Sequence, residues 1–80
     1  MWYVYVLKSL VNNRFYTGST NDLVRRLEEH NRGKSKYTKL TRPFVLVYKE
    51  KYFSRIEARR RERFLKTGKG REFIKTFLGM

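Results

Sequence analysis

Cysteine is absent from this 80-residue sequence, and histidine occurs only once. The first absence excludes a disulfide framework and a thiolate metal site, and a single imidazole cannot build a zinc cluster. A bound metal would therefore be a hard cation held by oxygen atoms. Long apolar runs are also missing, because residues 2–7 are too few to cross a bilayer and lack the layout of a signal peptide. We expect a cytoplasmic protein, with nucleoid association as an alternative and no membrane insertion.

Acidic residues are scarce as well: seven Asp and Glu oppose twenty Lys and Arg, which gives a formal net charge of +13. This excess is larger than solubility requires. It indicates a polyanionic partner, first nucleic acid and second an anionic membrane face. The simpler alternative is a ribosome-like basic protein without chemistry. Because repeats and linkers are missing too, we expect one domain over residues 1–80 with a small core.

The first third of the chain predicts two strands and a helix. Residues 2–7 are aromatic and β-branched throughout, which is typical of a strand covered on both faces. Asn12-Asn13 suits a turn with positive φ, and residues 14–17 would return as a second strand that ends at Gly18. Thr20 or Asn21 would cap the next helix, with Asp22 in its first turn. That helix would run to about Asn31 and stop at Gly33.

The rest of the chain predicts a basic loop, a strand and two helices. The loop covers residues 33–42, and the third strand covers 44–48 and can continue to Tyr52. Ser54 and Glu57 form a capping box, with Phe53 and Ala58 placed as a hydrophobic staple. This helix would run to about Lys66, glycines 68 and 70 would break it, and residues 71–78 would form the last helix. The order β-β-α-β-α-α predicts an α+β fold in which helices support a small three-stranded sheet.

Two tyrosines on the first two strands are candidates for one site. If strand pairing has a residue sum of 23, Tyr5 lies opposite Gly18 and diagonal to Tyr16. Packing is the commoner role of tyrosines in strands. Arg26 and His30 project from consecutive turns of the first helix, beside an apolar stripe of leucines. Their simpler roles are an ion pair between Arg26 and Glu29 and a structural histidine.

Glu62 is the carboxylate without an assigned structural role, since Glu57 already serves the capping box. It sits at the edge of the buried side of a densely basic helix. It is either paired with neighbouring arginines or a single oxygen ligand for Mg²⁺ or Mn²⁺, with phosphate and water completing the shell.

Further basic residues are candidates for contacts with phosphates. They are Arg25, which points away from the leucine stripe, and the loop residues Lys34, Lys36, Lys39 and Arg42, which interleave with Tyr37. No pattern in the chain is typical of base reading, so shape and backbone should lead recognition, with strong salt dependence.

Two short aromatic motifs lie near the start of the chain, Tyr3-Val4-Tyr5 and Tyr16-Thr17-Gly18. Further characteristic segments are residues 16–23 and 25–31, then 37–38 to 42–43, and finally 57–62. On these motifs and segments the chain resembles a GIY-YIG nuclease domain, especially its small stand-alone members, over almost all of its length. It implies a three-stranded antiparallel sheet flanked by helices.

The resemblance also implies roles for the candidate residues. Tyr5 would be the general base, Tyr16 would line the site, and Arg26 would steady the phosphate. His30 matches a histidine found in part of the family, and Glu62 matches the metal-binding glutamate. The implied activity is metal-dependent endonuclease cleavage of DNA, directed by structure rather than by sequence.

The chain departs from the family pattern at four positions. Tyr3 and Val4 replace the Gly and Ile of the first motif, Thr17 replaces the central Ile of the second, and Ser19 stands where some relatives carry lysine. The activation of Tyr5 is then an open question, because a phenol with a pKa near 10 is a poor base at neutral pH. The dense positive charge would lower the pKa of the phenol, or a metal-bound water that is already acidic would need a weaker base.

Two other classes of function compete with the nuclease. One is a basic nucleic-acid-binding module that keeps the fold and does not cut. The other is a membrane-surface protein, which the helices disfavour because they lack a clean apolar face. A homodimer is also open, since Trp2 and Phe77 can remain exposed in so small a fold.

Overall fold

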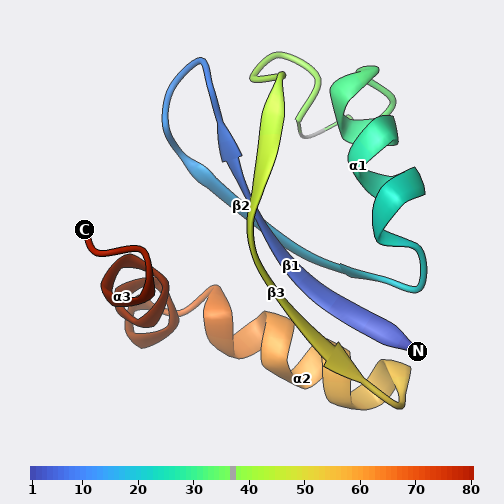
Figure 1. The fold of residues 1–80 in the computed structure, drawn as a ribbon, viewed down its shortest axis with the longest axis vertical. Coiled ribbons are helices and arrows are strands. Elements are labelled where there is room, and N and C mark those ends of the chain that lie inside the picture. Colours follow the sequence, from blue (N-terminus) through green and yellow to red (C-terminus); the bar gives the residue numbers. More distant parts are fainter. Residues whose placement is uncertain (37) are drawn as a thin grey trace.

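The computed structural model describes residues 1–36 and 38–80 and has the predicted order of elements (Figure 1). The elements are β1 (Trp2–Ser9), β2 (Phe15–Thr20), α1 (Leu23–Asn31), β3 (Phe44–Tyr52), α2 (Arg55–Leu65) and α3 (Gly68–Phe77). The predicted α+β fold is confirmed. Among the described residues, no helix combines the length and apolar character that a membrane crossing requires.

The sheet is antiparallel, with β1 between the two edge strands in the order β2-β1-β3. The central position explains why β1 is apolar on both faces: Val4, Tyr5, Val6 and Leu7 are each at most 2% exposed. Tyr5 pairs with Gly18, so the register is the one with a residue sum of 23. Asn13, in the turn between β1 and β2, has the expected positive φ of 62°.

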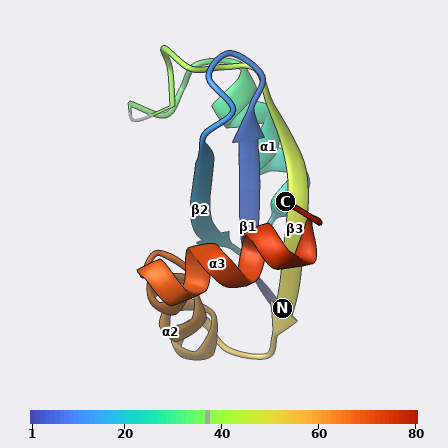
Figure 2. The same ribbon diagram turned by 90° about the vertical axis from the view of Figure 1, so that its left-hand side faces the viewer.

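Helices cover the sheet on both sides: α1 lies on one face, and α2 and α3 lie on the other (Figures 1 and 2). Side chains of β1 alternate between two cores. Val4 and Val6 pack with Ala58, Leu65 and Ile74 of the second and third helices. Tyr5 and Leu7 face the other way and pack with Phe44, Tyr16 and the α1 residues Leu23 and Leu27. A residue on β1 therefore belongs to one helical layer or to the other.

Of three predicted boundaries near the first helix, two are wrong and one is confirmed. Strand β2 does not end at Gly18 but continues to Thr20, so this prediction was wrong. The helix cap is neither Thr20 nor Asn21, because Asp22 itself accepts a hydrogen bond from the backbone N–H of Arg25 at 3.1 Å. Thr20 is the buried end of the strand and cannot also start the helix. The helix end is as predicted, with Gly33 just beyond it at a φ of 78°.

At the start of α2 the predicted cap is present and the predicted hydrophobic staple is absent. Ser54 caps the helix and accepts a hydrogen bond from the backbone N–H of Glu57 at 3.2 Å, which confirms the cap. The hydrophobic staple is wrong, because Phe53 is 87% exposed while Ala58 is fully buried. Ala58 packs into the core beside Val4 and Val6, so the exposed ring of Phe53 has no part in fixing the entry of the chain.

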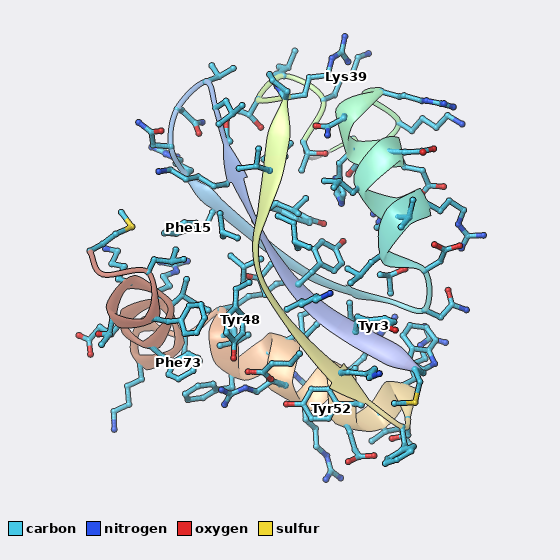
Figure 3. All side chains as sticks on the ribbon, in the orientation of Figure 1. Tyr3, Phe15, Lys39, Tyr48, Tyr52 and Phe73 are labelled. Carbon is cyan, nitrogen blue, oxygen red and sulfur yellow. The ribbon has the colours of Figure 1, made fainter. Side chains whose placement is uncertain are left out.

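The last helix begins earlier than predicted. Thr67 caps α3 by accepting a hydrogen bond from the backbone N–H of Gly70 at 3.2 Å, and both glycines lie inside the helix. Gly70 is buried against the end of α2. The helix thus restarts directly after α2, and the glycine permits the close approach of the two backbones. Ile74 is buried as expected. The ring of Phe73 packs edge-on against Tyr48 of β3 (Figure 3), and the exposed ring of Phe77 packs edge-on against the same tyrosine.

Replacing Gly70 with alanine should destabilise the protein by about 2 kcal/mol, measured as the free energy of unfolding in urea. The added Cβ would lie 2.2 Å from the carbonyl oxygen of Phe64 and 2.4 Å from Cα of Leu65, and backbone atoms cannot move aside cheaply. The matched control is Gly68→Ala, where a Cβ meets nothing within 4 Å. Because alanine restricts the unfolded chain, that control should be neutral or slightly stabilising. Equal effects of the two changes would contradict the close helix contact.

Candidate active site

A pocket of about 340 Å³ lies at the open edge of β2. Four of the predicted site residues line it, although they are far apart in the sequence: Tyr5, Tyr16, Arg26 and Glu62. The other lining residues are Gly18, Ser19, Arg59, Arg63 and Lys66. Tyrosines, an arginine and a carboxylate that share one pocket are chemically suited to hold a phosphodiester beside a nucleophile.

The pocket combines groups from both faces of the sheet. Tyr5 and Tyr16 pack on the α1 face, whereas Glu62 comes from α2 on the other face and meets Ser19. Gly18 makes this meeting possible, because a Cβ at that position would lie 2.5 Å from the phenol oxygen of Tyr5. Without a side chain at position 18, the phenol can reach the strand edge where the α2 residues arrive.

His30 contacts the hydroxyl of Tyr5. Its Nε2 is 3.1 Å from the Tyr5 hydroxyl, and its Nδ1 is 2.7 Å from the hydroxyl of Thr38. The imidazole is fully buried and lies edge-on to the ring of Tyr16, with centroids 4.9 Å apart. The histidine is therefore a satisfied buried residue, as the simpler alternative held, and it also positions Tyr5.

Burial sets the protonation of both partners. It raises the pKa of Tyr5 to about 12, against the opposing effect of a hydrogen bond from Arg26. It also lowers the pKa of His30 to about 4, and the nearby charge of Arg26 acts in the same direction. At neutral pH the phenol is protonated and the imidazole is neutral.

The stability of the protein should fall between pH 7.5 and pH 5 by about 2 kcal/mol because of His30. In the unfolded chain this imidazole takes up a proton near its ordinary pKa of 6.5, whereas in the folded chain it stays neutral down to about pH 4. Its contribution is complete above pH 6.5 and is lost as the pH falls toward 4. Urea unfolding at several pH values measures the slope.

The control for this slope is His30→Gln, which removes the titrating group. The free energy of unfolding of that variant should be nearly constant over the same pH range, whatever its absolute value. Glu50 and Glu62 have lowered pKa values, since hydrogen bonds to their carboxylates outweigh burial, and they titrate below this window. An unchanged slope in the variant would assign the effect to another group.

The predicted ion pair of Arg26 is confirmed, and its role toward a phosphate stays a prediction. Arg26 forms an ion pair with Glu29, with 3.1 Å between Nη1 and Oε1, and it also lines the pocket. About one third of each of these two side chains is exposed. The ion pair holds the guanidinium at the pocket wall, where it remains accessible to an anion.

Glu62 is held from two sides. Its Oε1 accepts a hydrogen bond from the hydroxyl of Ser19 at 2.6 Å, and its Oε2 accepts one from Nζ of Lys66 at 2.8 Å. Burial alone would raise the pKa of Glu62, but the hydrogen bonds from Lys66 and Ser19 outweigh it and lower the pKa. The group is a carboxylate at neutral pH, and the side chain is 20% exposed.

Part of the pocket wall consists of residues that were not predicted to belong to the site. Arg59, Arg63 and Lys66 line the pocket together with Glu62. A signal was present, because positions 59, 62, 63 and 66 have the i, i+3, i+4, i+7 spacing of a single helix face. Ser19 was noted only as a departure from relatives, and its hydrogen bond to Glu62 shows what the side chain does.

The other predicted phosphate contacts lie elsewhere. Lys39 projects at the end of the molecule remote from α2 (Figure 3). The remaining candidates are also exposed and do not line the pocket: Arg25, Lys34, Lys36 and Arg42. Tyr37, which interleaves with them in the sequence, lies outside the described residues. Their role in binding stays a prediction.

Comparison with known proteins places these features in context. The model of the family described as GIY-YIG catalytic domain matches residues 1–75. The UPF0213 protein SH2523 of Staphylococcus haemolyticus is 50% identical over 66 residues, which cover 81% of this chain and 79% of that protein. The UPF0213 protein SAV0488 of Staphylococcus aureus is 46% identical over 66 residues, with the same two coverages.

A solved structure is similar in fold. The solution NMR structure of the UPF0213 protein BH0048 from Bacillus halodurans superposes with a TM-score of 0.58 at 36% sequence identity. The match covers 96% of this chain and 85% of that one.

Proposed function

Because this chain belongs to the GIY-YIG catalytic domain family, a family of nuclease-type folds, we propose that it is a metal-dependent endonuclease. Its substrate would be DNA, recognised by structure rather than by base sequence. One observation carries the proposal: Tyr5, Tyr16, Arg26 and Glu62 line a single pocket. The net charge of +13 suits a polyanionic substrate.

In this proposal Tyr5 and His30 move a proton together. A phenol with a pKa of about 12 is protonated at rest, so it can take a proton from the attacking water only if it releases its own. In the tautomer in which Nδ1 of His30 donates its hydrogen to Thr38, Nε2 is an acceptor 3.1 Å from the Tyr5 hydroxyl and would receive that proton. The negative charge of a bound phosphate would raise the pKa of the imidazole and aid the transfer. As the water oxygen bonds to phosphorus, the bond from phosphorus to the leaving sugar oxygen breaks and that oxygen takes a proton from solvent. His30 then returns its proton through Tyr5 to solvent.

Arg26 and Tyr16 act on the phosphate. The guanidinium of Arg26, held by Glu29, would stabilise the charge that develops on the phosphoryl oxygens. Tyr16 packs against both Tyr5 and His30 and keeps the phenol oriented.

The donor set of the pocket fits Mg²⁺ or Mn²⁺ as a single-carboxylate site. Glu62 is a deprotonated oxygen donor, and Mg²⁺ is often held by one or two carboxylates with water and substrate phosphate. Among the described residues, no group of three or more His, Cys, Asp and Glu could hold a metal. Glu62 would hold the cation, which when bound supplies Lewis-acid stabilisation of charge on a non-bridging phosphate oxygen.

Lys66 should compete with the cation for Glu62, because its ammonium is 2.8 Å from Oε2. Replacing Lys66 with methionine should therefore tighten Mn²⁺ binding roughly tenfold, as one nearby positive charge at the ligand is removed. Calorimetric titration of Mn²⁺ in the absence of DNA measures this affinity. Lys69→Met, on an exposed lysine outside the pocket, is the control and should leave it unchanged. Weaker Mn²⁺ binding by the Lys66 variant would contradict competition at this carboxylate.

The purified protein incubated with branched and linear DNA, with Mn²⁺ or with a chelator, tests the proposed function. We expect metal-dependent products and faster cleavage of the branched substrate. Salt-sensitive binding without any product would instead identify a non-cutting nucleic-acid-binding module on the same fold.

A further inference from the structure

A second cavity adjoins the candidate active site. Its volume is about 760 Å³, and it lies between the β1–β2 turn, the first residues of β2 and helix α3. Tyr16 and Lys66 line both cavities, so the two are neighbours. Its size is within the range of roughly 300–1,000 Å³ that is typical of cavities for small ligands.

The lining of this cavity is basic. Arg14 comes from the turn, Lys66 from the end of α2, and Arg71 and Lys75 from one face of α3, where they are four residues apart. None of the described lining residues is acidic. Lys66 is paired with Glu62, whereas no ion pair among the described residues involves Arg14, Arg71 or Lys75. These three charges suit an anionic ligand.

The floor of the cavity is apolar. Phe15 on β2 is partly exposed and packs against the core beside Val6 (Figure 3). Leu65 lies next to it, and Met80 of the C-terminal segment lies at the rim. An aromatic ring beside a track of cations is the combination that binds single-stranded nucleic acid, because the ring takes a base and the cations take the phosphates.

We propose that this cavity, the flanking cavity, binds an unpaired nucleotide of the substrate next to the scissile phosphate. The base lies against Phe15, and the adjoining phosphates lie on Arg14, Arg71 and Lys75. The term scissile rests on the proposed nuclease function. The nucleotide must be unpaired, because a base within a duplex is stacked on its neighbours and cannot present its face to Phe15. The substrate class is therefore DNA with a single-stranded segment beside the cut.

Charge reversal in the flanking cavity tests the proposal by binding alone. The double variant Arg71→Glu/Lys75→Glu is compared with Lys51→Glu/Lys69→Glu, two exposed lysines outside the cavity. Each double variant changes the net charge of +13 by the same −4, to +9. The affinity for a labelled 12-nucleotide single strand is measured by fluorescence anisotropy with chelator present, at about 150 mM salt, where distant charges are screened beyond roughly 8 Å.

We expect the cavity variant to bind at least about tenfold more weakly. The slope of log affinity plotted against log salt concentration should become shallower by about 1.4, as expected for two lost phosphate contacts on a single strand. The control should stay within about threefold of the unmodified protein. Equal losses of affinity in the two double variants would overturn the proposal and show that binding depends only on the overall positive charge.

A photocrosslink locates the base directly. An oligonucleotide carrying 5-iododeoxyuridine in its unpaired segment is irradiated with the unmodified protein, and the adduct is mapped by mass spectrometry. A crosslink at Phe15 or Met80 supports the flanking cavity, and crosslinks confined to residues 33–42 reject it. Because both experiments run without cleavage, a protein that crosslinks there and never cuts would refute the nuclease alone. A protein that cuts while its cavity variant binds like the control would refute the flanking cavity alone.

Discussion

Replacing Glu62 with glutamine is expected to lower the rate of Mn²⁺-dependent DNA cleavage by roughly a thousandfold. The amide has nearly the size of the carboxylate but no charge, so it is a poor ligand for a hard cation. The single-turnover rate with saturating protein measures the loss. Binding to the same DNA with chelator should change by less than about threefold, because the variant removes a negative charge from a basic pocket.

The matched control is Glu57→Gln on the same helix. Glu57 is exposed, does not line the pocket and contacts the hydroxyl of Ser54 at 3.0 Å. It should retain full cleavage with a small change in stability. Cleavage by the Glu62 variant at the rate of this control would rule out a metal ligand at position 62.

Tyr5→Phe should lower the cleavage rate by about 10²–10⁴-fold, the range for loss of a positioned general base. The substitution keeps the packing of the ring and removes only the oxygen that faces Arg26 and His30. It also leaves Nε2 of the buried imidazole without its partner, which should cost about 1–3 kcal/mol of stability. Cleavage rates and urea unfolding of the same preparation separate the two effects.

Tyr3→Phe is the control for this variant. Tyr3 lies two residues earlier on the same face of β1, pairs with Thr20 and does not line the candidate pocket. It should keep the full cleavage rate. If the two phenylalanine variants cut equally well, Tyr5 is a packing residue and another group accepts the proton of the attacking water.

The pattern of the chain predicted most of the fold. The unbroken aromatic and aliphatic run of residues 2–7 indicates a strand with two buried faces, and β1 is the central strand. Asn13, Gly33 and Ser54 mark a turn, a helix end and a helix start because their local backbone chemistry does not depend on distant contacts.

The errors have a common cause. Local pattern predicts breaks at Gly18 and Gly70, because glycine weakens strands and helices. Each instead lies inside an element, where its missing side chain admits another group, the phenol of Tyr5 in one case and the backbone of α2 in the other. Phe53 failed as a staple partner because Ala58 packs into the core and the ring stays in solvent. Such contacts depend on residues that are distant in the sequence and that only the folded chain brings together.

The sequence by itself determined the order of the elements and the helix face shared by Arg26 and His30, since strand alternation and helical periodicity are local properties. The structure decided the register that sets Tyr5 against Gly18. Only the tertiary structure decided that Glu62 joins them. Tyr5 and Glu62 come from opposite faces of the sheet and meet only because β2 is an edge strand whose glycine leaves the margin open. That meeting depends on how α1 and α2 pack on the two faces, and no spacing along the chain encodes it.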